Sequence, residues 1–370
     1  MKTLLIVAIM LRAALALCGE EHSPAQLPEK TTISATLDVP HQKGQNLIWC
    51  NTLQLAWNAM GKDFCGEALR LEGTPAIEKS MNASTVSKAD VDAESALVKV
   101  GEVNQAFLDA LNGELKKRFG DDAPPPLKME IHPDAPDVLA YAYLFKNLAF
   151  ATPLDKQKEA LAWRGDEGAN APLQAFGLIK VGGANAGAAK QIQIVNDKHG
   201  EYIIELKTKS DADHIILAQV TPGATLKDTL DAVRKKVVKP DRAPFAIQVS
   251  DQCLMPCVGI DVTRVYNEII GKNILNAKLA NGYFISDARQ DIRFKLDEKG
   301  AVLKSEAQIV ASKNGHAARN ILFNRPFLLY IERARAVNPY LAIWFENPNL
   351  FIKSTAQPAA EAPQPKQSKF

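Results

Sequence analysis

Cysteine, repeated motifs and one-sided charge are all scarce in this chain of 370 residues. Its five cysteines are too few for a disulfide scaffold. The formal net charge of +2 gives no bulk attraction for nucleic acid or acidic lipid. No period of ~20–50 residues recurs, which excludes solenoids and propellers. The hydrophobic content of 46% and the charged content of 23% are those of an ordinary globular protein.

The usual signatures of enzyme and metal chemistry are also missing. No Gly-x-Ser-x-Gly elbow and no His-Glu-x-x-His pair occurs, and the six histidines are scattered singly. Cys253 and Cys257 form half of a metal site without a second pair. The glycine-rich stretch 182–187 lacks the acidic residue that a dinucleotide site requires. The sequence therefore predicts no catalytic residue, no metal and no cofactor.

Both ends of the chain differ in composition from the rest. Lys2, the apolar run 4–11 and the small residues up to Ala16 predict a secretory signal peptide over 1–16 and a secreted, extracellular or periplasmic protein. The run is too short for a membrane span, which needs ~20 residues. Lipid anchoring at Cys18 is a secondary alternative, because the preceding residue is a leucine. The Pro-, Ala- and Gln-rich residues 354–370 predict a disordered tail.

Hydrophobic periodicity changes along the chain. Helical spacing predicts helices over 46–60 and 100–119, and the second half reads mainly as strands interrupted by helices at 225–237 and 264–270. The strands are expected at 191–195, 202–206, 215–220, 246–249, 292–296, 326–331 and 340–345. Helices first and strands afterwards predict an α+β domain with large antiparallel sheets.

Two local clusters have both a chemical and a structural interpretation. The basic run 234–239 has the charge to bind a sulfated polymer, but a solvated helix end is the simpler interpretation. Cys50 and Cys65 are spaced like a disulfide pair. If Cys50 opens a helix, about ten helical residues carry the chain ~15 Å away, too far for a direct bond. No disulfide is predicted between them.

The last third carries a family resemblance. Residues 323–331 read Phe-Asn-Arg-Pro-Phe-Leu-Leu-Tyr-Ile, strand 340–345 is followed by Glu-Asn-Pro, and 294–300 read Phe-Lys-Leu-Asp-Glu-Lys-Gly. These segments resemble the C-terminal strands and the loop hinge of the serpins, and weaker similarities extend in order over 35–352. The resemblance implies a divergent serpin-like domain over 35–352, with a helical first half, large antiparallel sheets and an exposed reactive loop near the C-terminus.

The sequence departs from the serpin pattern where the sheet would open. Cys50-Asn51 stands in place of a Ser-Pro turn, and Leu53 in place of a serine. Tyr141 aligns with an expected asparagine, and Gln290 with an expected histidine. Several of the residues that serpins carry where the sheet opens are therefore replaced in this chain.

The resemblance also implies the parts of a reactive loop. The hinge residues are Glu298, Gly300, Ala301, Leu303 and Ser305. The scissile region is Lys313, Asn314 and Gly315, and Arg319 is a second candidate. Side chains 301, 303, 305, 307 and 309 share one face of an extended strand, and no proline interrupts them. Leu303 is larger than the expected small residue and adds about 1–3 kcal/mol of overpacking.

The function expected from the resemblance is inhibition rather than catalysis. The predicted protein is a secreted, monomeric serpin-type inhibitor of a serine endopeptidase, with the bait loop 301–321. Lys313 suits a trypsin-like protease with an acidic pocket. No nucleic-acid partner is expected, and membrane contact only through a lipid on Cys18. The alternative is a non-inhibitory serpin-like binding or carrier protein, which the altered opening region and Leu303 favour.

Overall fold

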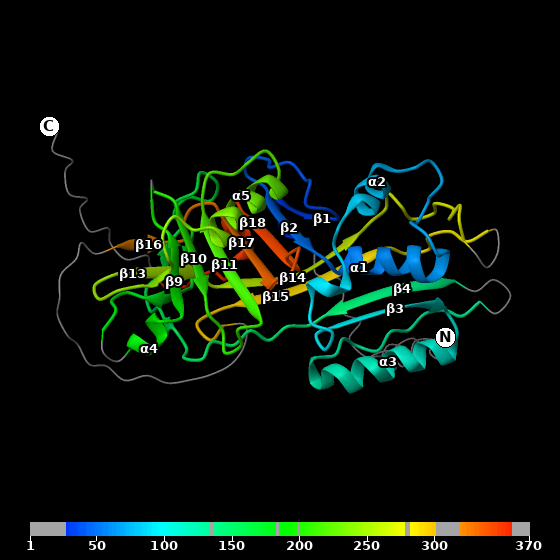
Figure 1. Cartoon of the computed structure of the whole chain (residues 1–370), viewed down its shortest axis with the longest axis horizontal. Coiled ribbons are helices and arrows are strands. Elements are labelled where there is room, and N and C mark those ends of the chain that lie inside the picture. The colour runs from blue at the N-terminus through cyan, green and yellow to red at the C-terminus, as the bar shows by residue number, and fades with distance from the viewer. Residues whose placement is uncertain are drawn as a thin grey trace, which may run out of the picture.

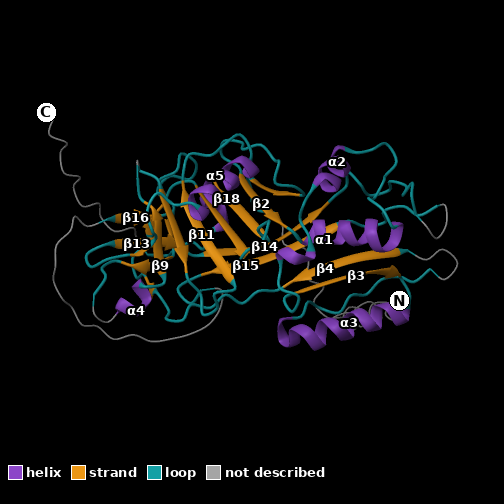
Figure 2. Ribbon diagram, in the orientation of Figure 1, coloured by secondary structure: helices purple, strands orange, loops and turns teal. Residues whose placement is uncertain are grey.

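The computed structural model describes residues 27–132, 137–182, 185–198, 200–277, 282–300 and 319–356. The molecule is elongated, with its largest sheet toward one end and α1, α2 and α3 toward the other (Figure 1). Strands outnumber helices throughout (Figure 2). The predicted signal peptide 1–16, Cys18 and residues 301–318 of the predicted bait loop lie outside the described residues. The predicted tail is described only to 356, and Ser354 N–H donates to Pro172 O at 2.9 Å.

The largest sheet has eight strands in the order β1-β2-β18-β17-β11-β10-β9-β12. All neighbours are antiparallel except β1 and β2. The strands are β1 (Thr31–Ser34), β2 (Asn46–Cys50), β9 (Ile192–Asn196), β10 (Tyr202–Leu206), β11 (Asp213–Gln219), β12 (Phe245–Ala246), β17 (Phe327–Arg333) and β18 (Leu341–Phe345).

Continuous apolar runs bury this sheet on both faces. All residues of β2 and β18 are buried, as is the sequence from Phe327 to Ile331. The rings of Phe327, Phe345 and Phe351 lie 4.7–5.9 Å apart. Helix α5 (Leu226–Val238) packs against β9 and β17 and starts with a capping box at Thr225. The region that resembles the serpin C-terminal strands is thus the centre of the core.

Four smaller sheets complete the strand set. One has the order β16-β13-β8-β5, and the other three are the pairs β3–β4, β14–β15 and β6–β7. Their strands are β3 (Ala96–Glu102), β4 (Val138–Leu144), β5 (Asp155–Lys156), β6 (Leu161–Ala162), β7 (Pro172–Leu173), β8 (Ala175–Leu178), β13 (Gln252–Pro256), β14 (Val258–Val265), β15 (Arg289–Leu296) and β16 (Asn320–Leu322). Large antiparallel pairings were expected and are present.

Helices α1 (Thr52–Ala59) and α3 (Gln105–Phe119) lie on opposite sides of the β3–β4 pair (Figure 1). A π-helical turn, Met60–Cys65, continues α1. Single 3₁₀ turns lie at Lys88–Asp90, Gly120–Asp122 and Pro348–Leu350. The other helices are α2 (Ala76–Ala83) and the short α4 (Ala186–Ala189).

The predicted helix 46–60 is wrong in its first third. Residues Asn46–Cys50 form β2, and α1 starts only at Thr52. The apolar run Leu47, Ile48 and Trp49 inserts between β1 and β18, where both faces of the strand are buried. A short apolar run of this kind fits a buried strand as well as a buried helix, so periodicity alone does not separate them.

Two further helix predictions change for similar reasons. The helix predicted at 100–119 starts at Gln105, because Asn104 caps it by accepting from Phe107 N–H, and Val100 belongs to β3. No helix forms at 264–270, since β14 continues through Val265 and pairs with β15. The first half is consequently less helical than predicted, because strands β1 to β8 alternate with its helices.

Candidate functional site

The candidate site lies where the β3–β4 and β14–β15 pairs meet. Among the described residues, β4 pairs only with β3, and β15 only with β14. The charge of Asp291 on β15 acts on Tyr141 of β4, and that of Arg293 acts on Tyr143. The residue numbers of these two pairs rise together, so β4 and β15 run in the same direction. We call the interval between the unpaired edges of β4 and β15 the seam.

The electrostatics of the seam are uneven. Burial raises the pKa of Tyr141, and the nearby Tyr143 and Asp291 add to this shift. Burial also raises the pKa of Tyr143, although the Arg293 guanidinium partly offsets it. Both phenols are therefore neutral at physiological pH. The charge along the seam comes from β15, since Asp291 and Arg293 belong to that strand.

Apolar side chains cover both faces of β4. Leu53 and Trp57 of α1 belong to the same apolar cluster as Val138 and Ala140. On the opposite face, Leu111 and other residues of α3 pack with Leu139, Tyr141 and Tyr143. Helix α1 contacts β15 as well as β3 and β4, so it underlies both walls of the seam.

Gln290 ties β15 to the start of α1. Its Nε2 donates to Cys50 O at 3.0 Å and to Thr52 Oγ1 at 2.8 Å, and its Oε1 accepts from Tyr266 O–H at 2.7 Å. The side chain is buried, so these bonds satisfy groups that no solvent reaches. Sequence comparison identified Gln290 only as a departure from a family pattern. Two of its partners, Cys50 and Thr52, lie more than 200 positions away, and no local signal pointed to them.

We predict that Gln290→Leu lowers the free energy of unfolding by about 3 kcal/mol, because the buried Cys50 carbonyl, Thr52 hydroxyl and Tyr266 hydroxyl all lose a partner. Urea denaturation followed by circular dichroism measures the difference. Gln248→Leu is the matched control, since Gln248 is exposed and should change stability by less than about 0.5 kcal/mol. Equal effects of the two substitutions would contradict the role of Gln290.

The predicted hinge sits at the end of β15. Lys299 O accepts from Phe150 N–H at 3.0 Å, and Glu298 O accepts from Leu154 N–H at 2.7 Å. Gly300 has a φ of +90°, which favours glycine, and bridges to Ala149. Glu298 and Gly300 are therefore anchored to the segment that follows β4. The remaining predicted loop residues, Ala301, Leu303, Ser305, Lys313, Asn314 and Gly315, lie outside the described residues.

Arg319, the second candidate for the scissile position, is poorly placed for that role. Its guanidinium lies 3.0 Å from Asp197 and 3.3 Å from Asp251. A protease pocket would have to displace both carboxylates to take this side chain. Lys313 stays the first candidate for the scissile position and lies outside the described residues.

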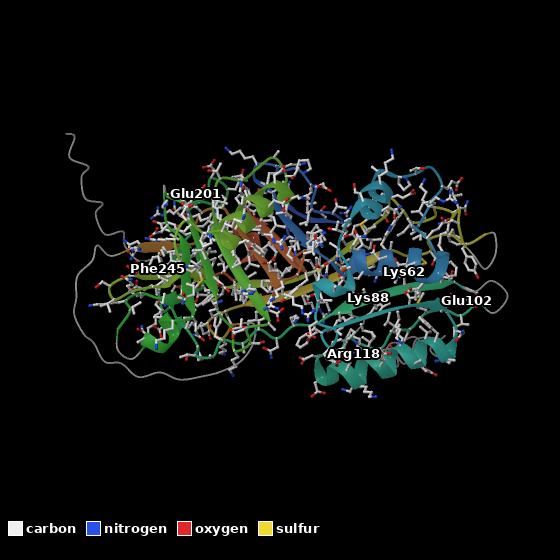
Figure 3. The ribbon with its side chains drawn as sticks, in the orientation of Figure 1. Lys62, Lys88, Glu102, Arg118, Glu201 and Phe245 are labelled. Atoms are coloured by element: carbon white, nitrogen blue, oxygen red, sulfur yellow. The ribbon has the colours of Figure 1, made fainter. Side chains whose placement is uncertain are left out.

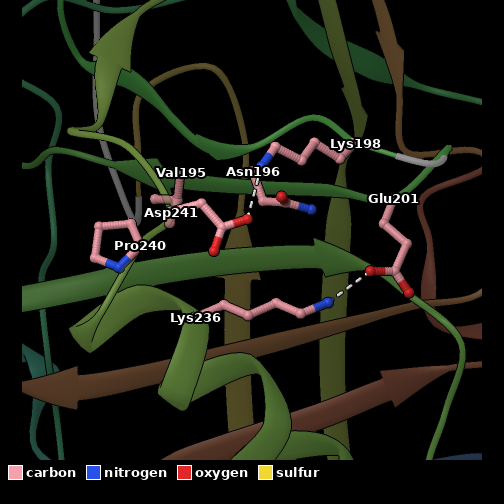
Figure 4. A pocket seen from close by; sticks show the side chains of 7 residues that line it. All are labelled: Val195, Asn196, Lys198, Glu201, Lys236, Pro240 and Asp241. Carbon is pink, nitrogen blue, oxygen red and sulfur yellow. Dashed lines mark hydrogen bonds and ion pairs between the residues drawn. The ribbon is translucent and has the colours of Figure 1, made fainter.

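The basic run at the end of α5 is paired within the fold. Arg234 bonds to Glu332 at 2.9 Å, and Lys236 to Glu201 at 2.6 Å. Lys236 and Glu201 line a hollow of about 220 Å³, in which Lys198 pairs with Asp241 at 2.7 Å. Figure 4 shows the side chains that line it. The lysines that line the hollow are thus matched by carboxylates, which supports a helix end rather than a polyanion site.

The described residues show no cluster of metal-ligating side chains. They contain no group of three His, Cys, Asp or Glu side chains arranged to hold a metal ion. Cys50, Cys253 and Cys257 are buried thiols, and burial raises the pKa of Cys50 and Cys253. Of the helices described, none has the length and apolar character needed to span a bilayer.

Comparisons with known proteins identify the fold. No protein-family model and no curated protein matches the sequence. Among solved structures, the mouse protein Z-dependent protease inhibitor is 15% identical with a TM-score of 0.50, and the match covers 83% of this chain and 92% of that one. The native thermophilic serpin tengpin is 9% identical with a TM-score of 0.43, covering 70% and 76% of the chains. Thyroxine-binding globulin in complex with thyroxine is 12% identical with a TM-score of 0.43, covering 69% and 77%. The first similarity extends over nearly the whole of the other chain, and the protein has a serpin-like α+β fold.

Proposed function

We propose that the protein is a serpin-type inhibitor of a serine endopeptidase, with residues 301–321 as the bait loop. The observation that supports this most strongly is the seam, because β4 and β15 lie close enough there for their charges to interact while each, among the described residues, pairs with one other strand only. The bait segment follows β15 directly through the hinge at Gly300. A segment that turns back at this hinge would enter the seam antiparallel to β15.

The protease supplies the reactive groups in this mechanism. Its serine oxygen attacks the carbonyl carbon of Lys313, the peptide bond to Asn314 breaks, and the Asn314 amine leaves with a proton. An ester then joins the serine oxygen to Lys313. Residues 301–309 insert as a strand before water hydrolyses that ester, and the movement pulls the attached protease away from its catalytic geometry.

The insert must match the two faces of the seam. Ala301, Leu303, Ser305, Ala307 and Ile309 share one face, which suits the apolar side formed by α1. Val302, Lys304, Glu306 and Gln308 share the other. Leu303 is the largest mismatch, and it would slow insertion relative to hydrolysis. A sufficiently slow insertion would give the alternative, a serpin-like binding protein without inhibition.

A covalent-complex assay tests the proposal. We expect trypsin to form an SDS-resistant complex with the wild-type chain, and Lys313→Glu to reduce complex formation at least about 100-fold, since an acidic pocket selects a basic side chain. Lys239→Glu makes the same charge change at an exposed position outside the loop and should leave complex formation intact. Cleavage at Lys313 without any complex would support the carrier alternative.

The setting of this activity is also part of the proposal. The N-terminal segment 1–16 favours export, so the target would be a protease outside the cytoplasm. A single chain supplies the bait loop and the seam, so the inhibitor would act as a monomer.

A further inference from the structure

Residues 37–41, between β1 and β2, lie across the start of α5, and we call them the strap. Leu226 N–H donates to Val39 O at 3.0 Å, and Lys227 N–H donates to Leu37 O at 2.8 Å. The first amides of a helix have no acceptor within the helix itself. The strap therefore supplies the acceptors that the first turn of α5 lacks.

The His41 side chain fastens the strap to the helix. Its Nε2 lies 2.8 Å from Thr229 Oγ1 on α5. That hydroxyl donates its single hydrogen to Thr225 O at 3.1 Å and accepts from Gly223 N–H at 2.8 Å. Because the hydroxyl hydrogen is used, His41 Nε2 carries the ring proton and donates it to Thr229. The neutral ring therefore has its free lone pair on Nδ1.

Protonation would create a second N–H where no group accepts it. His41 Nδ1 is shielded from solvent and has no hydrogen-bond partner among the described residues. The ring also packs edge-on against Trp344 of β18, with the ring centres 4.9 Å apart. A buried charged donor without an acceptor is costly. The geometry thus favours a neutral His41 as long as the strap stays in place.

One nearby carboxylate opposes this preference but does not overcome it. Asp228 of α5 acts on His41, but its Oδ2 already accepts from the N–H and the hydroxyl of Thr225 at 3.0 and 2.8 Å. The contact from β18, Trp344, carries no charge. Burial outweighs the Thr225 carbonyl and Asp228, and it lowers the pKa of His41 below its usual range.

The charged residues in and beside the strap interact elsewhere. The charge of Asp38 acts on Lys227. Lys43 pairs with Asp166 at 2.9 Å. The protonation state of His41 is therefore set mainly by its burial and by its bond to Thr229.

The other end of α5 is held without the strap. Arg234 pairs with Glu332 at 2.9 Å, and Lys236 pairs at 2.6 Å with Glu201, which Figure 3 labels. These ion pairs do not involve the strap. Loss of the strap would consequently open the first turn of α5 and leave its last turns attached.

We propose that His41 is a pH-sensitive anchor, which holds the strap on α5 at neutral pH and releases it in acid. Above about pH 6.5 the ring is neutral in both the held and the released states, so the anchor is fully effective. As the pH falls below that value, the released state takes up the proton more readily than the held state, and the equilibrium moves toward release. This inference is independent of the proposed function, because none of its groups belongs to the bait loop or the seam.

Hydrogen exchange of the full chain, read by mass spectrometry at about pH 7.5 and about pH 5, tests the anchor. After correction for intrinsic exchange rates, we expect the protection of amides 226–228 to fall at least about tenfold in acid. The amides of β10 serve as the internal reference and should keep their protection. His41→Gln retains an uncharged donor, so its amides 226–228 should be equally protected at both pH values.

His214→Gln is the matched control. His214 Nδ1 lies 2.5 Å from Glu205 Oε1, and this bond raises the pKa of His214, so acid strengthens the contact. The variant should therefore keep the full acid response of amides 226–228.

Two exchange results would overturn the proposal: unchanged protection of amides 226–228 in the wild type at about pH 5, or an acid response that persists in His41→Gln. If His41→Gln does not fold, NMR titration of wild-type protein with labelled histidine decides. The His41 signal, assigned through its contact with Trp344, should titrate below about pH 6.5, and titration at or above that value rejects the anchor.

Discussion

Cleavage after Lys313 is expected to raise the melting temperature of the protein by roughly 20 °C. Residues 301–309 would gain backbone hydrogen bonds on both edges of the seam, each worth about 1 kcal/mol net, or about 10 kcal/mol in all. In a domain of more than ~200 residues, each kcal/mol shifts the melting temperature by about 2 °C. A thermal melt before and after limited trypsin digestion, with the nick located by mass spectrometry, measures the shift.

The control for this experiment is a loop that can be cut but not inserted. Ala307→Pro keeps Lys313 and removes a backbone N–H from the middle of the insert, so it has no place in a central strand. Its melting temperature should change little on cleavage. If cleavage at Lys313 leaves the stability of the wild-type protein unchanged, the result would favour a serpin-like binding protein whose loop does not insert.

Gly300→Ala is expected to lower the free energy of unfolding by about 3–5 kcal/mol. An added Cβ would lie 2.5 Å from Leu148 O and 2.7 Å from Phe150 N, and the φ of +90° strains any other residue. The obstruction is backbone, so the hinge must move and lose the bonds from Phe150 and Leu154. Urea denaturation measures the loss of stability.

Gly271→Ala is the control that separates backbone strain at a positive φ from the steric clash of an added Cβ. Gly271 has a φ of +77°, and no described atom lies within 4 Å of an added Cβ there. Backbone strain alone should lower stability by about 1 kcal/mol. Equal losses at the two glycines would mean that contact between the hinge and residues 148–150 contributes nothing.

The elements that could be predicted are those whose patterns are local. The strand predicted at 202–206 has the observed bounds, Tyr202–Leu206, and the helix predicted at 225–237 differs from α5 by one residue at each end. Thr225 and Asp228 supply a capping box that is readable in the sequence. The motif that predicts a hinge at Glu298 and Gly300 follows β15, where Glu298 O and Lys299 O accept hydrogen bonds from Leu154 and Phe150, and the hinge itself stays a prediction.

The secondary-structure predictions that were wrong concern segments whose conformation depends on distant partners. Asn46–Cys50 is a strand because β1 and β18 bury both its faces, and β18 lies nearly 300 positions later. Val265 stays in β14 because β15 pairs with it. Asn51, noted only as a departure, is buried with neither amide atom of its side chain bonded among the described residues. The burial of Asn51 depends on residues that only the tertiary fold brings beside it.

The sequence by itself determined the serpin resemblance, the alternation of the bait segment and the absence of familiar enzyme motifs, because each is carried by adjacent residues. Only the tertiary structure decided that, among the described residues, β4 pairs with β3 alone and β15 with β14 alone, that Gln290 ties β15 to α1, and that the Arg319 guanidinium lies beside Asp197 and Asp251. The physical reason is that these properties arise from hydrogen bonds and ion pairs between segments far apart in the chain. Their partners are fixed only when the sheets pack together.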